Sequence, residues 1–560
     1  MKRCPECRRD YFDDTLLYCL DDGNALVDGP ASLDEPATAI LYSTDVAEAP
    51  TWVHKNAAES GSALRPIARR YPRRWLLVGG VAAAVLLFAA FVYWNFRDPA
   101  SDPIRSIAVL PFENSSGNTD LDYLTDGLSE SLIDRLSQMP DLKVIARSSS
   151  FKYRESSPNF GAIAEALGVD AIVAGRVVPR GDSFEIRVEL IDARENKHLW
   201  GATFTRTAGD IQKLQTDITR EITENLKVQL SGAQTIRFAR QGSSNTQAYE
   251  MFLRGRFYLN KAGEPENFQK AVDYFEQAIV LDPNFALAYA YLVETYSFGG
   301  ITRGLSREQH EAKLDAAAER ALSLDPELAE AYNAFAGLNR NKWEWEKSEQ
   351  AYLKAIELNP NLAQAHSGYA FYLNLIGRND EAREHIRRAR ELDPFSLIIN
   401  TAHGALHYRM REYDEAIEVS KRAIELGGRA MFAHRTLGSA YAAKGMYPQA
   451  MEHYTEAQQI LGGRSASFQS LIGTALAKSG QHGPAETILS ELITGGSVGN
   501  PEVALLYAAL NRNDEAFAVL ERAFLERNQT LPFIAVDPAY DGLRADTRFA
   551  ALLRRMGLSR

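Results

Sequence analysis

The stretch Lys354-Ala-Ile-Glu-Leu-Asn-Pro360 decides the fold, because it returns as Arg388-Ala-Arg-Glu-Leu-Asp-Pro394. The two prolines are 34 residues apart (394 − 360), and Pro326 precedes Pro360 by the same interval. An Asp-Pro or Asn-Pro after an Ala-x-x-Leu helix end therefore marks a unit that repeats along the chain. Two antiparallel helices fit one such period, and units of this kind bury a continuous core only by stacking on one another. The stretch predicts an all-α solenoid.

The repeat resembles the tetratricopeptide (TPR) family in its period and in the residues inside each unit. Small residues fall where helices cross closely, and an aromatic residue fills the gap between them. The clearest unit contains Gly438, Tyr441, Gly445, Ala450, Tyr454 and Ala457. We expect about eight units over residues 247–530, well above the three or so that bury a continuous core. The gap of 43 residues between Pro283 and Pro326 (326 − 283) indicates an insertion near residues 299–306.

The resemblance implies a concave groove, lined by the first helix of each unit, that binds other proteins or peptides. The pattern places nine candidate residues in this groove: Asn333, Arg340, Asn341, Ser367, Phe371, Asn374, Tyr408, Arg409 and Arg435. Amide and guanidinium groups suit an extended peptide. The alternative is a groove that is merely solvated. The repeated Lys/Asn clamp of chaperone-binding TPR domains is missing, so a carboxylate tail is not indicated as the ligand.

Two further features belong to the solenoid. Trp343 and Trp345 replace the usual glycine between the helices of one unit. We expect them to cap the core at the helix turn, and the alternative is a pair of exposed binding aromatics. Residues 531–560 are expected to close the last repeat, as solenoids require. In that segment Leu552, Leu553 and Met556 form the apolar side, and Arg554 and Arg555 face water.

Residues 75–94 read WLLVGGVAAAVLLFAAFVYW and contain no charged side chain. Twenty helical residues span about 30 Å, the thickness of the hydrocarbon core of a bilayer. Arginines are dense before this segment and sparse after it, so the positive-inside rule puts the N-terminus in the cytoplasm and the later residues outside. A signal peptide begins nearer the N-terminus, and a buried core helix rarely runs this long without a polar residue. We therefore predict a single transmembrane helix that contacts the lipid bilayer.

The three cysteines all lie in the first twenty residues, which is a poor disulfide framework and fits a reducing compartment and a metal. Cys4 and Cys7 form a Cys-x-x-Cys knuckle, and Cys19 and Asp22 keep the same spacing. Zinc accepts thiolate and carboxylate ligands in a tetrahedron. Residues 1–26 resemble the short zinc-ribbon heads of bacterial membrane proteins, which implies a structural zinc ion. Asp21 or water is an alternative fourth ligand, and a head without metal is the alternative to the whole site.

Residues 27–72 read as a flexible linker rich in Ala, Ser, Pro, Thr and acidic residues. The whole chain has 560 residues and a net charge of −11, so we expect several domains and no general nucleic-acid binding, whose footprint is basic.

Residues 102–232 alternate between strand and helix signals and predict one α/β domain. Strands are expected at 104–112, 142–146, 171–178, 184–191 and 197–206, and helices at 121–139, 160–167 and 208–230. A turn is expected at 113–117, and Gly168 suits the end of the second helix because glycine takes the left-handed conformation there.

This domain also carries polar groups that we examined as catalytic candidates. Asp122 and Asp126 are four residues apart on the first predicted helix, as are Glu130 and Asp134, and we interpret both rows as solvated helix faces. The serine run at 148–150 follows a strand without the Gly-x-Ser-x-Gly elbow, so we expect a loop there. We predict that the chain is not an enzyme.

The stretch SIAVLPFENSSGNTDLDYLTDGLSESLIDRLSQMPDLKVIARSSSFKY at 106–153 and the later GVDAIVAGRVVPRGDSFEIRVELIDARENKHLWGATF resemble the TolB amino-terminal-like domain of bacterial membrane proteins. That family typically places the domain between one transmembrane helix and a TPR array. Its cytoplasmic module is often an adenylate cyclase, a protein kinase or a winged-helix domain. This chain has no Gly-rich phosphate loop before residue 75, so inherited enzymology is not expected.

The sequence therefore predicts a bacterial inner-membrane protein with a single pass, a cytoplasmic N-terminus and an extracytoplasmic TPR array. Its expected function is that of a protein-interaction scaffold or receptor-like sensor. Two alternatives stay open: a non-catalytic subunit or relative of a cyclase-type or kinase-type signalling enzyme, and a component of envelope assembly or secretion.

Overall fold

The computed structural model describes residues 103–154, 159–226, 242–261, 265–299, 306–497 and 499–558, with three short strands near the N-terminus. The chain divides into two compact units, Met1–Pro99 and Ala100–Arg560. The predicted zinc ligands Cys4, Cys7, Cys19 and Asp22, the part of the predicted linker at 29–72 and the predicted span at 75–94 lie outside the described residues. The first two residues of the predicted linker, Val27 and Asp28, form a short strand. In the described part, none of the helices combines the length and the apolar character that a membrane span requires.

The first unit contains a small antiparallel sheet. Its strands are β1 (Lys2–Arg3), β2 (Asp10–Tyr11) and β3 (Val27–Asp28), in the order β2-β1-β3. Lys2 lies opposite Tyr11 on one side and Asp28 on the other. The Cys-x-x-Cys sequence falls between β1 and β2 along the chain.

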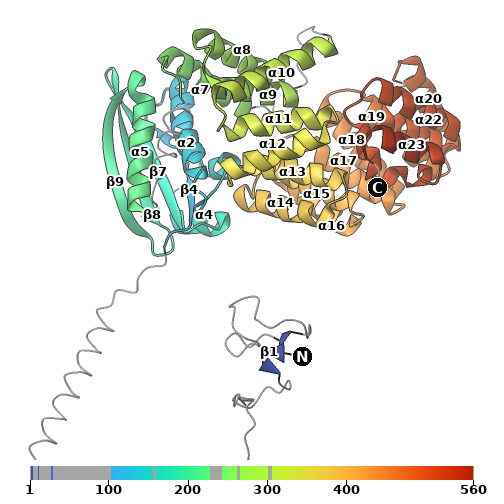
Figure 1. Cartoon of the computed structure of the whole chain (residues 1–560), viewed down its shortest axis with the longest axis horizontal. Coiled ribbons are helices and arrows are strands. Elements are labelled where there is room, and N and C mark those ends of the chain that lie inside the picture. The colour runs from blue at the N-terminus through green and yellow to red at the C-terminus, as the bar shows by residue number, and fades with distance from the viewer. Residues whose placement is uncertain are drawn as a thin grey trace, which may run out of the picture. The chain divides into compact units, whose positions relative to one another are not determined.

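The second unit begins with the α/β domain, whose main sheet runs in the order β6-β4-β7-β8-β9 (Figure 1). The strands are β4 (Ser106–Val109), β5 (Glu113–Asn114), β6 (Lys143–Val144), β7 (Ala171–Arg180), β8 (Ser183–Asp192) and β9 (Lys197–Thr207). The short central strand β4 pairs in parallel with β6 and β7, and β7, β8 and β9 form an antiparallel meander. The strand expected over 104–112 is shorter than predicted. Residues 113–114, expected in a turn, form β5 beside the second half of β7, because β7 runs on past the end of β4.

Helices cover both faces of this sheet. On one face, α2 (Asp122–Ser137) and α5 (Ile211–Asn225) share a core with Ile107 and Val109. On the other face, α4 (Phe160–Leu167) packs on Ala108 and Ile172. Successive residues of β4 point to opposite faces, and both faces are buried, so Ile107, Ala108 and Val109 are all apolar. As expected, α4 ends at Gly168, whose φ of 62° is left-handed.

The solenoid contains eight helical pairs in the described residues, from α7 to α22 (Figure 1). The first helices of the pairs are α7 (Thr246–Asn260), α9 (Ala286–Gly299), α11 (Ala329–Asn341), α13 (Ala363–Leu375), α15 (Leu397–Arg409), α17 (Met431–Ala443), α19 (Ala466–Lys478) and α21 (Pro501–Ala509). The second helices are α8 (Pro265–Leu281), α10 (Arg307–Leu324), α12 (Trp345–Leu358), α14 (Asn379–Leu392), α16 (Tyr413–Glu425), α18 (Tyr447–Leu461), α20 (His482–Thr494) and α22 (Asn513–Leu525). We call the surface formed by the first helices the first-helix face.

The turn inside each of the last six pairs, from α11 to α22, contains a left-handed residue at a fixed position. Gly377 and Gly445 take φ values of 89° and 75° there, and Trp343 and Arg411, at the equivalent positions, take 63° and 66°. A side chain in this conformation costs about 1–2 kcal/mol, so packing elsewhere must hold Trp343 and Arg411 in place.

The α/β domain docks on the Asn-Pro and Asp-Pro turns that close two repeats. The Asn361 amide donates to the carbonyl oxygens of Ser137, Met139 and Leu142 at 2.8, 3.2 and 2.8 Å. One repeat later, the buried Asp393 carboxylate accepts hydrogen bonds from the hydroxyl groups of Ser148 and Ser149. The serine run is thus a short helix, α3 (Arg147–Ser150), and the loop prediction was wrong.

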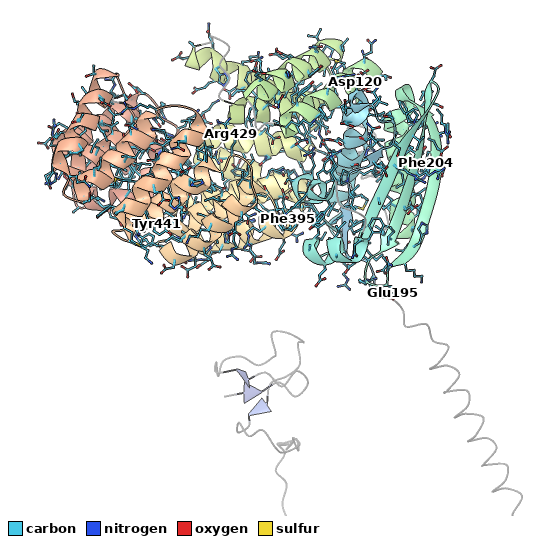
Figure 2. The ribbon with its side chains drawn as sticks, turned by 180° about the vertical axis from the view of Figure 1, so that it is seen from behind. Asp120, Glu195, Phe204, Phe395, Arg429 and Tyr441 are labelled. Carbon is cyan, nitrogen blue, oxygen red and sulfur yellow. The ribbon has the colours of Figure 1, made fainter. Side chains whose placement is uncertain are left out.

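Phe395 completes this contact. Its backbone N–H donates to Ser149 Oγ at 2.8 Å, and its ring lies 4.0 Å from Lys152 Nζ. Figure 2 labels Phe395 where the solenoid meets the α/β domain. The turns that mark the repeat in the sequence therefore also hold the two domains together.

The carboxylates of α2 are not on a solvated face, so that expectation was wrong. Asp126 and Glu130 are 3% and 1% exposed. Arg154 donates to Asp126 at 2.6 Å, and Arg256, from α7 of the solenoid, donates to Asp134 at 2.5 Å and lies 2.9 Å from Glu130. Helix α2 packs against β4, α5 and α7, so most of its circumference is buried and its acidic residues need arginine partners.

Candidate peptide-binding site

The nine candidate groove residues all belong to first helices, four of which follow one another in the solenoid. Helix α11 carries Asn333, Arg340 and Asn341; α13 carries Ser367, Phe371 and Asn374; α15 carries Tyr408 and Arg409; and α17 carries Arg435. Ser367, Asn374 and Tyr408 are buried, and the others are half-buried. The repeat register predicted these helices, but three of these side chains, Phe371, Tyr408 and Arg409, have neighbours from another part of the chain.

That part is the segment after the last repeat. It forms two 3-10 turns, η4 (Leu531–Ala535) and η5 (Pro538–Leu543), followed by helix α23 (Thr547–Arg555). Helix α23 closes α22 as expected, with Leu552 and Met556 buried and Arg555 paired with Glu521. The turns η4 and η5 instead contact α13, α17 and α21, so residues 531–543 cover part of the first-helix face. We call residues 531–543 the covering segment.

The covering segment places an aromatic ring on two candidate groove residues. The Phe533 ring meets the Phe371 ring edge-on, with centroids 6.3 Å apart. The Arg409 guanidinium lies 4.4 Å from the Phe533 centroid and 4.8 Å from the Phe371 centroid. Such contacts between a cation and aromatic faces are strongest where water is excluded. Burial lowers the pKa of Arg409 to about 10.

The covering segment also places a carboxylate in the site. The Tyr408 hydroxyl donates to Asp537 Oδ1 at 2.7 Å. Burial and this carboxylate hold the pKa of Tyr408 well above its ordinary value, so the hydroxyl stays protonated and able to donate. Beside it, Arg435 donates to Glu502 of α21 at 2.6 Å. Four of the nine candidates, from three different helices, therefore meet around the covering segment and α21.

Three of the other candidates, Arg340, Asn341 and Asn374, make contacts within the repeats. Arg340 reaches the Tyr352 hydroxyl at 3.4 Å and the side-chain oxygen of Asn341 at 3.3 Å. The Asn374 amide donates to Asn379 at 3.0 Å, which ties α13 to α14. These groups stabilise the helical pairs.

Trp343 and Trp345 are covered by the C-terminal part of the chain. The Trp343 ring packs on Phe524 with centroids 5.5 Å apart, and Arg527 lies 4.8 Å from it. Trp345 Nε1 donates to the Met556 carbonyl at 2.7 Å. The third repeat thus contacts the eighth repeat and α23, a closure that the repeat pattern did not predict.

Sequence reasoning also missed Phe533 and Asp537. A weak signal for them exists, because Pro532 and Pro538 each stand at the start of a short turn after the 34-residue period has ended. A capping helix alone does not need two such turns.

Two comparisons with family models match this chain in part. A model described as HilA/YgeH-like transcriptional regulator, second domain, matches residues 103–221, and a tetratricopeptide repeat model matches residues 351–384. The solenoid is therefore a TPR-type solenoid joined to an α/β domain. The match over the α/β domain is to the HilA/YgeH-like model, and the resemblance to the TolB amino-terminal-like domain stays a prediction.

The chain is 31% identical over 212 residues to a protein named putative adenylate cyclase 3 of Rhizobium meliloti (strain 1021). The aligned part is 36% of each protein, so the chain spans about a third of the length of this curated relative. Among solved structures, the type IV pilus biogenesis factor PilW is 17% identical, with a TM-score of 0.33, over 39% of this chain and 96% of that one. The Cut9 and Hcn1 hetero-tetramer of the APC/C is 16% identical, with a TM-score of 0.38, over 62% and 63%.

Proposed function

We propose that this chain is a membrane-anchored scaffold or receptor-like sensor whose TPR solenoid binds a protein or peptide outside the cytoplasm. The observation that supports this most directly is the solenoid itself, eight helical pairs with a TPR family match inside them. Arrays of this type use extended surfaces to hold other chains. The first-helix face adds aromatic and guanidinium groups, which are the usual anchors of protein interfaces.

We further propose that the α/β domain is not catalytic. Its candidate acids and serines are engaged inside the protein: Asp126 and Glu130 with arginines, and Ser148 and Ser149 with Asp393. Groups held in this way stabilise the junction between the domains. A nucleophile or base needs instead to reach a substrate.

In-membrane cross-linking with the full chain as bait tests the binding proposal. We expect one or a few partners whose cross-links map by mass spectrometry to residues 242–558. Cross-links that map only to residues 1–241 would contradict binding by the solenoid.

The membrane anchor and the zinc ion are separate proposals with their own tests. A reporter fused after Arg560 is expected to be active only outside the cytoplasm, and cytoplasmic activity would rule out the proposed topology. Metal analysis of the purified full chain is expected to give one zinc ion per chain. The Cys4→Ser/Cys7→Ser variant is expected to give none, and a metal-free wild-type chain would rule out the site.

A second candidate is a non-catalytic subunit or relative of a membrane signalling enzyme. The observation that favours it is the 31% identity over 212 residues to the protein named putative adenylate cyclase 3. This candidate predicts that the cross-linked partner is itself a nucleotide cyclase or kinase. If the cross-linked partner were instead an envelope component, the result would favour the first proposal, a scaffold, over a subunit of a signalling enzyme.

A further inference from the structure

The first-helix face holds guanidinium groups that lack acidic partners. Among the described residues, neither Arg340 nor Arg409 has a carboxylate within ion-pair distance, whereas Arg435 is paired with Glu502. Arg409 Nη1 is buried and has no hydrogen-bond partner there. A buried donor without an acceptor is costly, and arginine in particular suits carboxylates. This face therefore favours a ligand that carries an acidic group.

The covering segment shows which other chemistry fits the same face. The Phe533 carbonyl accepts hydrogen bonds from the backbone N–H groups of Val536 and Asp537, at 3.0 and 2.9 Å. This closed turn lets the Phe533 ring reach Phe371 and Arg409 while the Asp537 carboxylate reaches Tyr408. An aromatic ring and a carboxylate four positions apart thus form a compact pair of anchors.

The covering segment is attached in two different ways. Four apolar side chains, Leu531, Ile534, Tyr540 and Leu543, are at most 4% exposed. Its rim contact, the ion pair between Arg411 and Asp541, is 47% and 43% exposed. Exposed ion pairs contribute little. Helix α23 is attached separately, because Phe549, Leu552 and Met556 are buried in the same core as Phe517 and Leu520 of α22. The chain is therefore held on both sides of any opening at residues 531–543.

We propose that the covering segment is an internal ligand of the first-helix face, and that a partner peptide with an aromatic residue followed four positions later by an acidic residue takes its place. This inference rests on the proposed function and names the chemistry of its partner. The partner carboxylate is a side chain of the peptide, which distinguishes this mode from recognition of a chain terminus. The buried apolar residues keep the segment closed most of the time. The apparent affinity of the intact chain for the peptide therefore equals the affinity of the open form multiplied by the fraction of molecules that are open.

The test uses the solubilised full chain and a fluorescent synthetic peptide of residues 529–541. The Phe533→Ala/Asp537→Asn variant weakens the covering segment and leaves Phe371, Tyr408 and Arg409 intact. By fluorescence anisotropy, we expect this variant to bind the peptide at least about tenfold more tightly than the wild type, as a tenfold rise in the open fraction requires. Adding Arg409→Leu is expected to abolish that gain.

Two controls accompany the measurement. A peptide with both anchors replaced, Phe533→Ala and Asp537→Asn, is expected not to bind. The Leu525→Ala variant, at a side chain 71% exposed just before the segment, is expected to behave as wild type. A folded double variant with wild-type affinity, or full binding that persists with Arg409→Leu, would overturn the proposal.

If the double variant fails to fold, hydrogen exchange of the wild-type chain tests instead whether the covering segment opens locally. We expect the amides of residues 531–543 to exchange through local opening, faster than those of α15. Exchange of both only through global unfolding would overturn the proposal. Neither result bears on the partner found by cross-linking, so a failure here leaves the proposed function standing, and the reverse also holds.

Discussion

The hydroxyl of Tyr408 donates a 2.7 Å hydrogen bond to the carboxylate of Asp537, although the two residues are 129 positions apart. Tyr408 belongs to the fifth helical pair and Asp537 to the segment that follows the eighth. The bond therefore shows that the C-terminal segment lies against the first-helix face. It is the first contact that we would test.

We expect Tyr408→Phe to reduce the free energy of unfolding by about 1–3 kcal/mol, because it leaves the half-buried Asp537 carboxylate without this donor. Chemical denaturation of the full chain measures the change. Tyr441→Phe is the control, since the Tyr441 ring stacks on His453 in α18. Equal effects of the two variants would contradict the role of the Asp537 contact.

Arg256→Met is expected to cost about 3–5 kcal/mol, because it leaves the buried Glu130 and the half-buried Asp134 carboxylates without this partner. Thermal unfolding measures the loss. Arg254→Met, two positions earlier on α7, is the matched control. Arg254 pairs with Glu250 at a half-exposed site, where such pairs contribute about 1 kcal/mol at most. Similar losses for both variants would show that the α2 cluster does not hold the two domains together.

Asn361→Ala is expected to cost about 1–3 kcal/mol, because three carbonyl oxygens of the α/β domain lose their donor. Urea unfolding measures the change. Glu327→Ala changes the exposed residue at the same position of the preceding unit, 34 residues earlier, and is expected to be nearly silent. A silent Asn361→Ala would contradict docking through the closing turns.

The histidine pairs of the solenoid predict a pH dependence. His366 Nδ1 lies 2.9 Å from His385 Nδ1, and burial lowers the pKa of His366 to about 4. His385 and Arg388 of α14 lower this pKa further, whereas the hydrogen bond to the Pro360 carbonyl and the Glu384 carboxylate raise it. His403 Nε2 lies 2.9 Å from His407 Nε2, and burial, His407, Arg390 of α14 and Arg422 of α16 lower the pKa of His403 to about 3.

Below pH 6.5 the unfolded chain takes up protons that the folded chain refuses, so these histidines reduce stability as the pH falls from about 6.5 towards 4. At pH 5 the loss is about 2 kcal/mol for each histidine. Glu294 and Glu330, whose pKa burial raises to about 7, act in the opposite direction, because the folded chain holds their protons more firmly.

A comparison of the histidine variant with the wild type therefore tests this prediction better than the pH dependence of wild-type stability alone. Urea unfolding at pH 7.5 and pH 5.0 is expected to show a smaller loss for His366→Gln/His403→Gln than for the wild type. His482→Gln, at an exposed position of α20, is the control. An unchanged loss in the double variant would contradict the assignment.

Much of the local structure follows from the sequence. The apolar stripe of Leu124, Leu128, Leu132 and Leu136 predicted α2, and all four side chains are buried. Gly168 ends α4 as expected, and the 34-residue period placed the nine candidate groove residues on first helices. Such signals depend on neighbours within one or two turns, so a pattern is enough to read them.

The acidic residues of α2 show where pattern reading failed. Asp126, Glu130 and Asp134 are spaced like a solvated row, but their surroundings are set by Arg147, Arg154 and Arg256, which come from other elements. The spacing of a charge row is the same whether water or arginine faces it. Asn361 and Asp393 behave likewise, because they read as turn residues and also dock a second domain.

By itself, the sequence determined the repeat, the order of the longer helices and strands and the residues that the first helices carry. Only the tertiary structure decided that the third repeat meets the eighth and that residues 531–543 lie against α13 and α17. The curvature of a solenoid is the sum of small rotations between neighbouring repeats. Each rotation depends on side-chain packing that a periodic pattern does not specify, so the contact between Tyr408 and Asp537 becomes visible only when all of them are combined.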